Sequence, residues 1–137
     1  MAARTKARKR ALDVLFESEV RGLRLDGTLA DRMAAAEPPV NEYTVRLVHG
    51  VVEHQPRIDE LVTAYAQGWS LGRMPAVDRN ALRIGIYEVL YVGDVPDAVA
   101  VSEAMGLVRD LSTDESPGFV NGVLGNIVRD KAVLIAG

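Results

Sequence analysis

Five basic side chains stand within the first ten residues, with no acidic residue among them. They give this segment a net charge of +5, whereas the other 127 residues hold 11 basic and 19 acidic side chains, a net −8. Clustered Lys and Arg side chains can hold several phosphates of one nucleic-acid strand by displacing its counterions. The acidic remainder argues against a general nucleic-acid coat, which would spread positive charge over a whole face. The alternative interpretation is a solubilising, frayed terminus. The basic residues are Arg4, Lys6, Arg8, Lys9 and Arg10.

An aromatic side chain follows the basic segment at helical spacing. Phe16 lies two helical turns beyond Arg8 and Lys9, so a helix through this region would place a ring beside the positive charge. Unpaired bases stack on exposed aromatic faces, and aromatic residues make up only 5% of the chain. The alternative for Phe16 is ordinary packing in a core.

Residues suited to covalent or metal chemistry are scarce. The chain has no Cys, and its two histidines, His49 and His54, are five residues apart, so on one helix they point in diverging directions. No glycine-rich phosphate loop and no zinc-protease motif occurs. Most carboxylates are dispersed, and several fall where a first helical turn favours negative charge. We therefore predict no enzyme activity, no cofactor and no metal site.

No segment has the length or composition of a membrane span. The longest uncharged stretch, residues 116–128, has 13 residues and includes Ser, Pro and two Asn. This is too short and too polar to cross a bilayer. We expect a soluble, cytoplasmic protein without a membrane partner.

Helix start and stop signals recur along the whole chain and predict a single all-α domain over residues 1–137, with residues 1–10 as a basic arm. Ser, Thr and Asn at cap positions, Pro at first helical positions and Gly at the ends delimit about seven helices. The expected helices begin at Thr5, Thr28, Asn41, Pro56, Pro75, Pro96 and Ser116. The second is expected to run through Glu37 and to end at the two prolines that follow.

Residues 76–92 are apolar almost all round, which is typical of a helix buried among other helices. The alternation of Leu82, Ile84 and Ile86 would also suit a strand. The length of the segment and its flanking Pro75 and Gly93 favour the helix.

Three charged residues in and after this segment predict structural ion pairs. Arg83, Glu88 and Glu103 fall at positions where neighbouring helices would meet, and we expect them to pair at the rim of the core.

Several motifs resemble the NusB family of transcription antitermination factors. They are "RKRALDVLFESEV", "VHGVVEHQPRIDELV", "WSLGRMPAVDRNALRIGIYEVLYVGDVP", "VSEAMGLV" and "DESPGFVNGVLGNI", in this order and nearly end to end. The resemblance implies an all-helical fold of two three-helix subdomains packed nearly at right angles.

The resemblance also implies a function and partners. Members bind single-stranded boxA-type RNA of ribosomal RNA leader transcripts together with NusE, a small-subunit ribosomal protein, and act within an RNA polymerase complex that suppresses termination. Carried over by motif, the implied RNA-binding residues are Arg4, Lys6, Arg8, Lys9, Arg10, Phe16, Asp78, Tyr87 and Phe119. The resemblance implies that Glu115 contacts the protein partner.

Two other functions remain open at this point, together with self-association. The chain could be a detached RNA-targeting module of a ribosomal RNA methyltransferase, a class that shares the fold, or a structural helical dimer. Apolar residues on several sides of the first helix, Leu12 and Phe16 among them, predict a concentration-dependent homodimer that competes with RNA.

Overall fold

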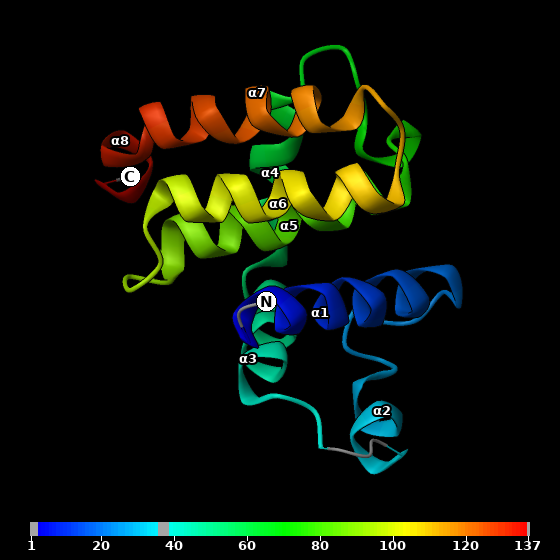
Figure 1. The fold of residues 1–137 in the computed structure, drawn as a ribbon. Helices are drawn as coiled ribbons and strands as arrows, with labels where there is room; N and C mark the ends of the chain where they lie inside the picture. The colour runs from blue at the N-terminus through cyan, green and yellow to red at the C-terminus, as the bar shows by residue number, and fades with distance from the viewer. Residues whose placement is uncertain (1–2, 36–38, 137) are drawn as a thin grey trace. The chain divides into compact units, whose positions relative to one another are not determined.

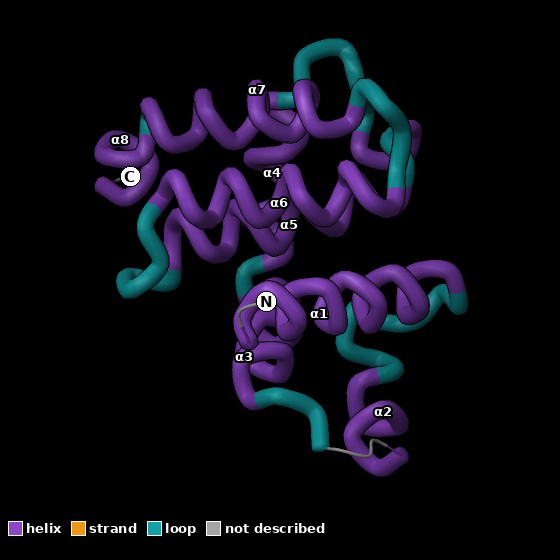
Figure 2. The backbone as a smooth tube through the Cα atoms, viewed as in Figure 1, coloured by secondary structure: helices purple, strands orange, loops and turns teal. Residues whose placement is uncertain are grey.

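The computed structural model describes residues 3–35 and 39–136, and every regular element in these ranges is helical (Figures 1 and 2). The predicted all-α class is confirmed. The chain divides into two compact units, residues 1–54 and residues 55–137. The predicted end of the second helix at Glu37 lies outside the described residues.

Three helices make up the first unit: α1 (Ala3–Val20), α2 (Leu29–Ala35) and α3 (Glu42–Glu53). Helix α1 packs along α3, and the Thr44 hydroxyl donates a hydrogen bond of 2.9 Å to the backbone oxygen of Ala7. The predicted start of the first helix at Thr5 is wrong, because α1 already begins at Ala3. The buried apolar side chains of the pair include Ala7, Ala11, Leu12, Leu15, Leu47, Val48 and Val51.

A buried polar cluster fastens the segment after α1 back onto that helix. The Ser18 and Thr28 hydroxyls lie 2.9 Å apart, and the backbone N–H of Thr28 donates to the Ser18 oxygen at 3.1 Å. The turn leaves α1 through Gly22, whose φ of 71° falls in the left-handed region that glycine adopts without strain. These contacts satisfy polar groups that burial would otherwise leave unpaired.

The second unit holds the remaining elements. They are α4 (Gln55–Tyr65), the short 3-10 helix η1 (Leu71–Arg73), α5 (Ala76–Tyr91), α6 (Asp97–Leu111), α7 (Ser116–Arg129) and α8 (Lys131–Ala136). The described residues thus form eight α-helices and one 3-10 helix, against about seven predicted. The two short elements η1 and α8 were not predicted, because three and six residues are too few to show a helical period.

Helix α5 lies at the centre of this unit, packed against α4, α6 and α7. The helical interpretation of residues 76–92 is confirmed and the strand alternative is wrong. The absence of a side chain at Gly85 lets α7 approach closely, because a Cβ there would come within 2.7 Å of a methyl carbon of Leu124. Burial on every side explains why the segment is apolar all round.

Arg83 forms a buried ion pair with Asp59 of α4. Its Nε lies 2.8 Å from Asp59 Oδ1 and its Nη2 lies 3.1 Å from Oδ2, while Nη1 donates to the Asn80 side chain at 2.8 Å. The Arg83 side chain is only 4% exposed. An ion pair was predicted for Arg83, but Asp59 was not among its predicted partners because it lies 24 residues earlier in the chain, on another helix.

Candidate nucleic-acid interface

The basic segment is part of a helix, so its five side chains do not share one direction. Successive residues of an α-helix are turned by about 100°, which places Arg4 and Arg8 on one side and Lys6 and Arg10 on another. The Arg4 Cζ atom lies 4.2 Å from the centre of the Tyr43 ring, and that of Arg8 lies 5.7 Å from it. Arg8 is 3% exposed. This pair therefore stabilises the α1–α3 contact through cation–π interactions.

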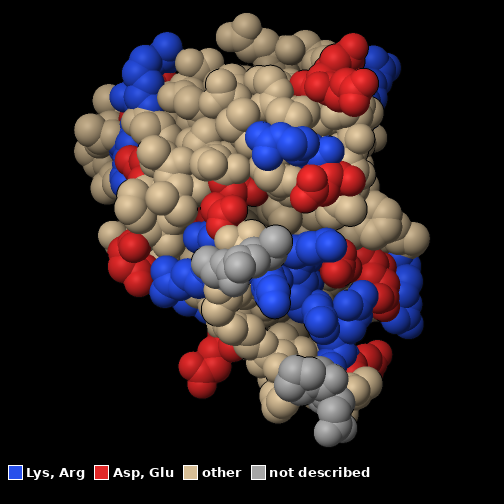
Figure 3. Space-filling model, in the orientation of Figure 1, with Lys and Arg blue, Asp and Glu red and all other residues tan. Residues whose placement is uncertain are grey.

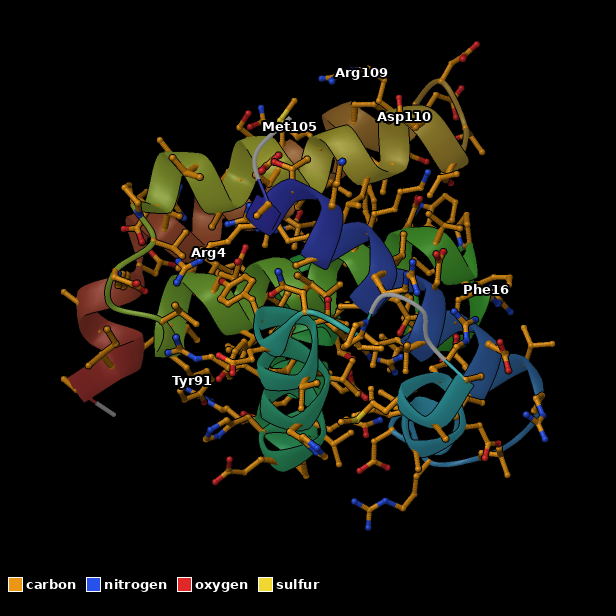
Figure 4. The ribbon with its side chains drawn as sticks, turned by 60° about the horizontal axis from the view of Figure 1, so that its bottom comes forward. Arg4, Phe16, Tyr91, Met105, Arg109 and Asp110 are labelled. Carbon is orange, nitrogen blue, oxygen red and sulfur yellow. The ribbon has the colours of Figure 1, made fainter. Side chains whose placement is uncertain are left out.

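The other three basic residues, Lys6, Lys9 and Arg10, are exposed to solvent. Phe16 accompanies them on the exposed side of α1, with 39% of its surface accessible. We call Lys6, Lys9, Arg10 and Phe16 the basic face. Figure 3 shows Lys and Arg atoms gathered over α1, and Figure 4 shows Phe16 toward the end of that helix opposite to Arg4.

A groove of about 190 Å³ borders the basic face, between α1 and the residues that lead into α3. Lys6 and Arg10 line it, as does Asn41, whose side-chain oxygen accepts a 2.7 Å hydrogen bond from the backbone N–H of Tyr43. Two cations beside a small polar groove suit a phosphate group, which accepts several charge-assisted hydrogen bonds.

Acidic side chains border the basic face in the C-terminal half of α1. Glu17 accepts hydrogen bonds from Arg32 of α2 and from Arg21. The hydrogen bond from Arg32 lowers the pKa of Glu17 below its usual value. These neutralised pairs confine the unbalanced positive charge to the N-terminal half of the helix.

Asp78, implied by the resemblance as an RNA-binding residue, is 3% exposed at the first turn of α5. Its Oδ2 accepts a 2.9 Å hydrogen bond from the Ser116 hydroxyl, which fastens the start of α7 to the start of α5. Its Oδ1 is buried without a hydrogen-bond partner among the described residues. Glu115 is exposed at the N-cap position of α7. The structure thus brings Asp78 and Glu115 to the same pair of helix starts.

The two remaining aromatic predictions have different surroundings. Tyr87 is 7% exposed and stacks on Tyr91, with ring centres 5.7 Å apart and an interplanar angle of 27°. Phe119 is half-buried, and its ring centre lies 5.8 Å from that of Trp69 at an angle of 39°. Asp78 and Tyr87 are both buried and contribute to the packing of the second unit. Their direct contact with RNA stays a prediction.

Sequence reasoning missed two aromatic residues that the structure places beside predicted site residues. The ring of Tyr43 contacts the guanidinium groups of Arg4 and Arg8, and the ring of Trp69 contacts that of Phe119. Trp69 is the only tryptophan of the chain and lies within one of the motifs that resemble the NusB family. Its place in that motif was the feature of the sequence that could have drawn attention to it. Nothing local in the sequence links Tyr43 to a residue 39 positions earlier.

No group of three or more His, Cys, Asp or Glu residues in the described part of the chain could hold a metal ion. None of its helices is both long and apolar enough to cross a membrane.

Comparison with known proteins defines the class to which this fold and surface belong. A transcription antitermination protein NusB of a Nocardioides species is 66% identical over 134 residues, which cover 98% of this chain and 99% of the relative. The protein of the same name from Kineococcus radiotolerans is 60% identical and covers 99% of this chain and 100% of the relative. The chain is thus similar along its length to transcription antitermination proteins.

Solved structures agree with this class. NusB of T. maritima superposes with a TM-score of 0.86 at 32% identity, covering 96% of this chain and 94% of that one. A chain in a crystal structure of the antitermination factors NusB and NusE in complex with dsRNA gives a TM-score of 0.79 at 28% identity, covering 92% and 96%. The model of the NusB family matches residues 5–129. The chain belongs to the NusB family, as the resemblance predicted.

Proposed function

We propose that this chain is an RNA-binding transcription antitermination factor. It recognises boxA-type RNA of ribosomal RNA leader transcripts together with NusE, and it acts on termination by RNA polymerase. Membership in the NusB family and the similarity to a chain solved with NusE and dsRNA support this proposal. The near full-length similarity to antitermination proteins favours it over a methyltransferase module.

The observation that carries the proposal is the basic face. Lys6, Lys9 and Arg10 are exposed on the same helix as the half-exposed ring of Phe16, in a chain that is otherwise acidic. Phosphates would bind the three cations while an unpaired base stacks on the ring. Arg4 and Arg8 would support this surface by holding α1 against Tyr43.

The proposal also covers the location, domain organisation and protein partner of the chain. The protein acts as a cytoplasmic, non-enzymatic adaptor, and residues 1–137 work as one NusB-like functional domain without a cofactor. Glu115, exposed at the start of α7, contacts NusE. The predicted homodimer through α1 stays a prediction, and Val20, 67% exposed, adds apolar surface on which it could form.

A salt titration of RNA affinity tests the proposal. Fluorescence anisotropy of a labelled single-stranded boxA RNA, measured with and without NusE, should show binding that NusE strengthens. Three contacted phosphates predict a slope of log K against log salt of about −2, from about −0.7 per phosphate. Replacing Lys6, Lys9 and Arg10 together by Ala should flatten this slope toward zero.

A matched variant controls for net charge. Arg46, Arg109 and Arg129 are exposed on α3, α6 and α7, and Arg109 extends away from α6 in Figure 4. Replacing these three by Ala removes the same charge from outside the basic face and should leave the slope within about 0.5 of the parent protein, because the slope counts only the phosphates that the protein contacts. Equal losses in both triple variants would show that α1 has no special role.

The same titration with a duplex of the boxA sequence distinguishes the form of the RNA. Stacking on Phe16 needs an unpaired base, so we expect the single strand to bind more tightly. A duplex that binds more tightly would contradict the single-stranded part of the proposal and would leave the basic face as a phosphate-binding surface.

A further inference from the structure

A groove of about 420 Å³ lies between α6 and α7, within the second unit. Most of the side chains that line it are apolar: Ala98, Val101 and Met105 from α6, and Val128 from α7, beside Gly125. Among the described residues that line it, only Asp97 is ionisable, and the Nζ atom of Lys131 lies 2.9 Å from its Oδ1. The groove therefore presents apolar surface without an unbalanced charge.

Gly125 leaves the α7 side of the groove open. The residue is exposed, and a Cβ at this position would meet no atom of another helix within 4 Å. By contrast, a Cβ at Gly85 of α5 would come within 2.7 Å of Leu124, so helix packing accounts for that glycine. Glycine in the interior of a helix lowers its stability relative to alanine. Packing within the fold gives no reason for Gly125, and the space above it is free for another molecule.

Two arginines lie at the ends of this groove. Arg109 follows Met105 by one helical turn on α6, and Arg129 follows Gly125 by one turn on α7. The two helices are joined by the four residues 112–115 and run antiparallel (Figure 1). Because the last turn of each helix carries one of the arginines, the two cations lie at opposite ends of the groove.

Both guanidinium groups are accessible to a partner. Arg109 is exposed and has no hydrogen-bond or ion-pair partner among the described residues, and it extends from the same side of α6 as Met105 in Figure 4. Arg129 is 69% exposed and pairs only through its Nε, 3.2 Å from Asp130. Within the described α6 and α7, the one other exposed charged side chain is Asp110, which is turned by about 100° from Arg109. The surface thus combines an apolar centre with a cation at each end.

We propose that this groove binds an amphipathic helix of a protein partner, whose apolar stripe faces Met105 and Gly125 and whose two carboxylates pair with the arginines at the ends. Helices bind apolar grooves through side chains spaced by three or four residues. The stretch of α6 from Asp97 to Arg109 is about 18 Å long, so the carboxylates would stand about three turns apart on the partner helix. No lining residue is among those proposed to contact RNA or NusE, so the inference goes beyond the proposed function.

An NMR titration of the full chain with a synthetic peptide tests this docking. The probe is a helical peptide of about 16 residues with Leu along one side, Ala and Gln elsewhere, and two Glu residues about three turns apart. The control peptide carries Lys in place of both Glu residues. The Glu peptide should shift the backbone amide signals of Met105 and Gly125. It should bind about 5- to 30-fold more tightly than the Lys peptide, because it gains two ion pairs where the Lys peptide meets two like charges.

Substitutions test the apolar centre and the charged ends separately. Gly125→Leu fills the groove and should lower the affinity for the Glu peptide by about 10-fold or more. The matched control is Asn126→Leu, at an exposed neighbouring position that does not line the groove, and it should leave the affinity unchanged. Reversing both arginines, Arg109→Glu together with Arg129→Glu, should exchange the preference, so that the Lys peptide binds more tightly. Circular dichroism checks that each variant keeps its helices, and Gly125→Leu should bind boxA RNA as the parent protein does.

Three results would overturn this docking site. The first is an absence of amide shifts at Gly125, or equal binding of the two peptides. The second is a shift at Gly125 that grows with protein concentration alone, which would assign the groove to a second copy of the chain. The third is displacement of the peptide by boxA RNA or NusE, which would assign the groove to the partners already proposed. None of these results would contradict the proposed function, which the RNA titration tests by itself.

Discussion

The guanidinium of Arg4 lies over the ring of Tyr43, with 4.2 Å between Cζ and the ring centre. Tyr43 is buried at the start of α3, so this contact joins the N-terminal turn of α1 to the neighbouring helix. Arg8, one turn further along α1, lies 5.7 Å from the same ring centre. Two of the five basic residues thus contribute to the packing of the first unit, and three remain for an external ligand.

Arg8 and Lys9 are adjacent in the sequence, yet the structure predicts opposite phenotypes for them. Arg8→Met should lower the free energy of unfolding by about 1–2 kcal/mol, because a desolvated cation–π contact is lost, and should change the salt slope little. Lys9→Met should change unfolding by less than about 0.5 kcal/mol and reduce the slope by about 0.7. Urea denaturation and RNA titration of both variants check this pair. The same phenotype in both would mean that the two sides of α1 are not distinct.

Phe16→Ala should weaken RNA binding by about 5- to 140-fold at low and at high salt alike, because stacking does not depend on counterion release. The loss of unfolding free energy should stay below about 2 kcal/mol, since Phe16 is 39% exposed and only filled-core phenylalanines cost about 3–5 kcal/mol. Anisotropy at two salt concentrations and urea denaturation give both quantities. A large stability loss with normal RNA binding would restore the core interpretation of Phe16.

Asp59→Ala should destabilise the protein by about 3 kcal/mol, because it leaves the buried Arg83 guanidinium without its carboxylate. The neighbouring change Glu60→Ala breaks an exposed pair with Arg57 and should cost less than about 0.5 kcal/mol. Adding Arg83→Met to Asp59→Ala should recover part of the loss, since the unpaired charge is then removed. Denaturant unfolding of the four proteins measures each value. A double variant as unstable as Asp59→Ala would show that the charge is not the cause.

The hydrogen bond from the Tyr65 hydroxyl to Asp130, 2.7 Å long, should stabilise the fold only within a pH window. It raises the pKa of Tyr65 above 10.0, so its contribution is complete below that value and is lost as the pH rises through the raised pKa. The same hydrogen bond lowers the pKa of Asp130 below 3.8. Its stabilisation of the fold is therefore complete above pH 3.8 and is lost as the pH falls through the lowered pKa of Asp130.

Tyr65→Phe isolates this contact. The difference in unfolding free energy between the parent protein and the variant should be constant from about pH 5 to 9 and should shrink at both extremes. Denaturant unfolding across this range measures the difference. In the variant, the pKa of Asp130, followed by NMR, should move up toward 3.8. An unchanged Asp130 pKa would show that Tyr65 does not cause its shift.

Local features of the sequence determined most of the helices. Caps, prolines and the apolar period depend on residues a few positions apart, so the helical nature of α3, α5 and α6 could be predicted without knowledge of their neighbours. The motifs spread over the chain were likewise sufficient to predict membership in the NusB family. The short elements η1 and α8 escaped because each is shorter than two helical turns.

Contacts between distant residues could be decided only by the tertiary structure. The charge of the first ten residues follows from the sequence, but the position of Tyr43 on α3 determines that Arg4 and Arg8 turn inward while Lys6, Lys9 and Arg10 stay exposed. The pairing of Arg83 with Asp59 depends in the same way on the packing of α5 against α4. Which side of a helix is covered depends on the helix packed against it, and no periodicity within the helix itself specifies that neighbour.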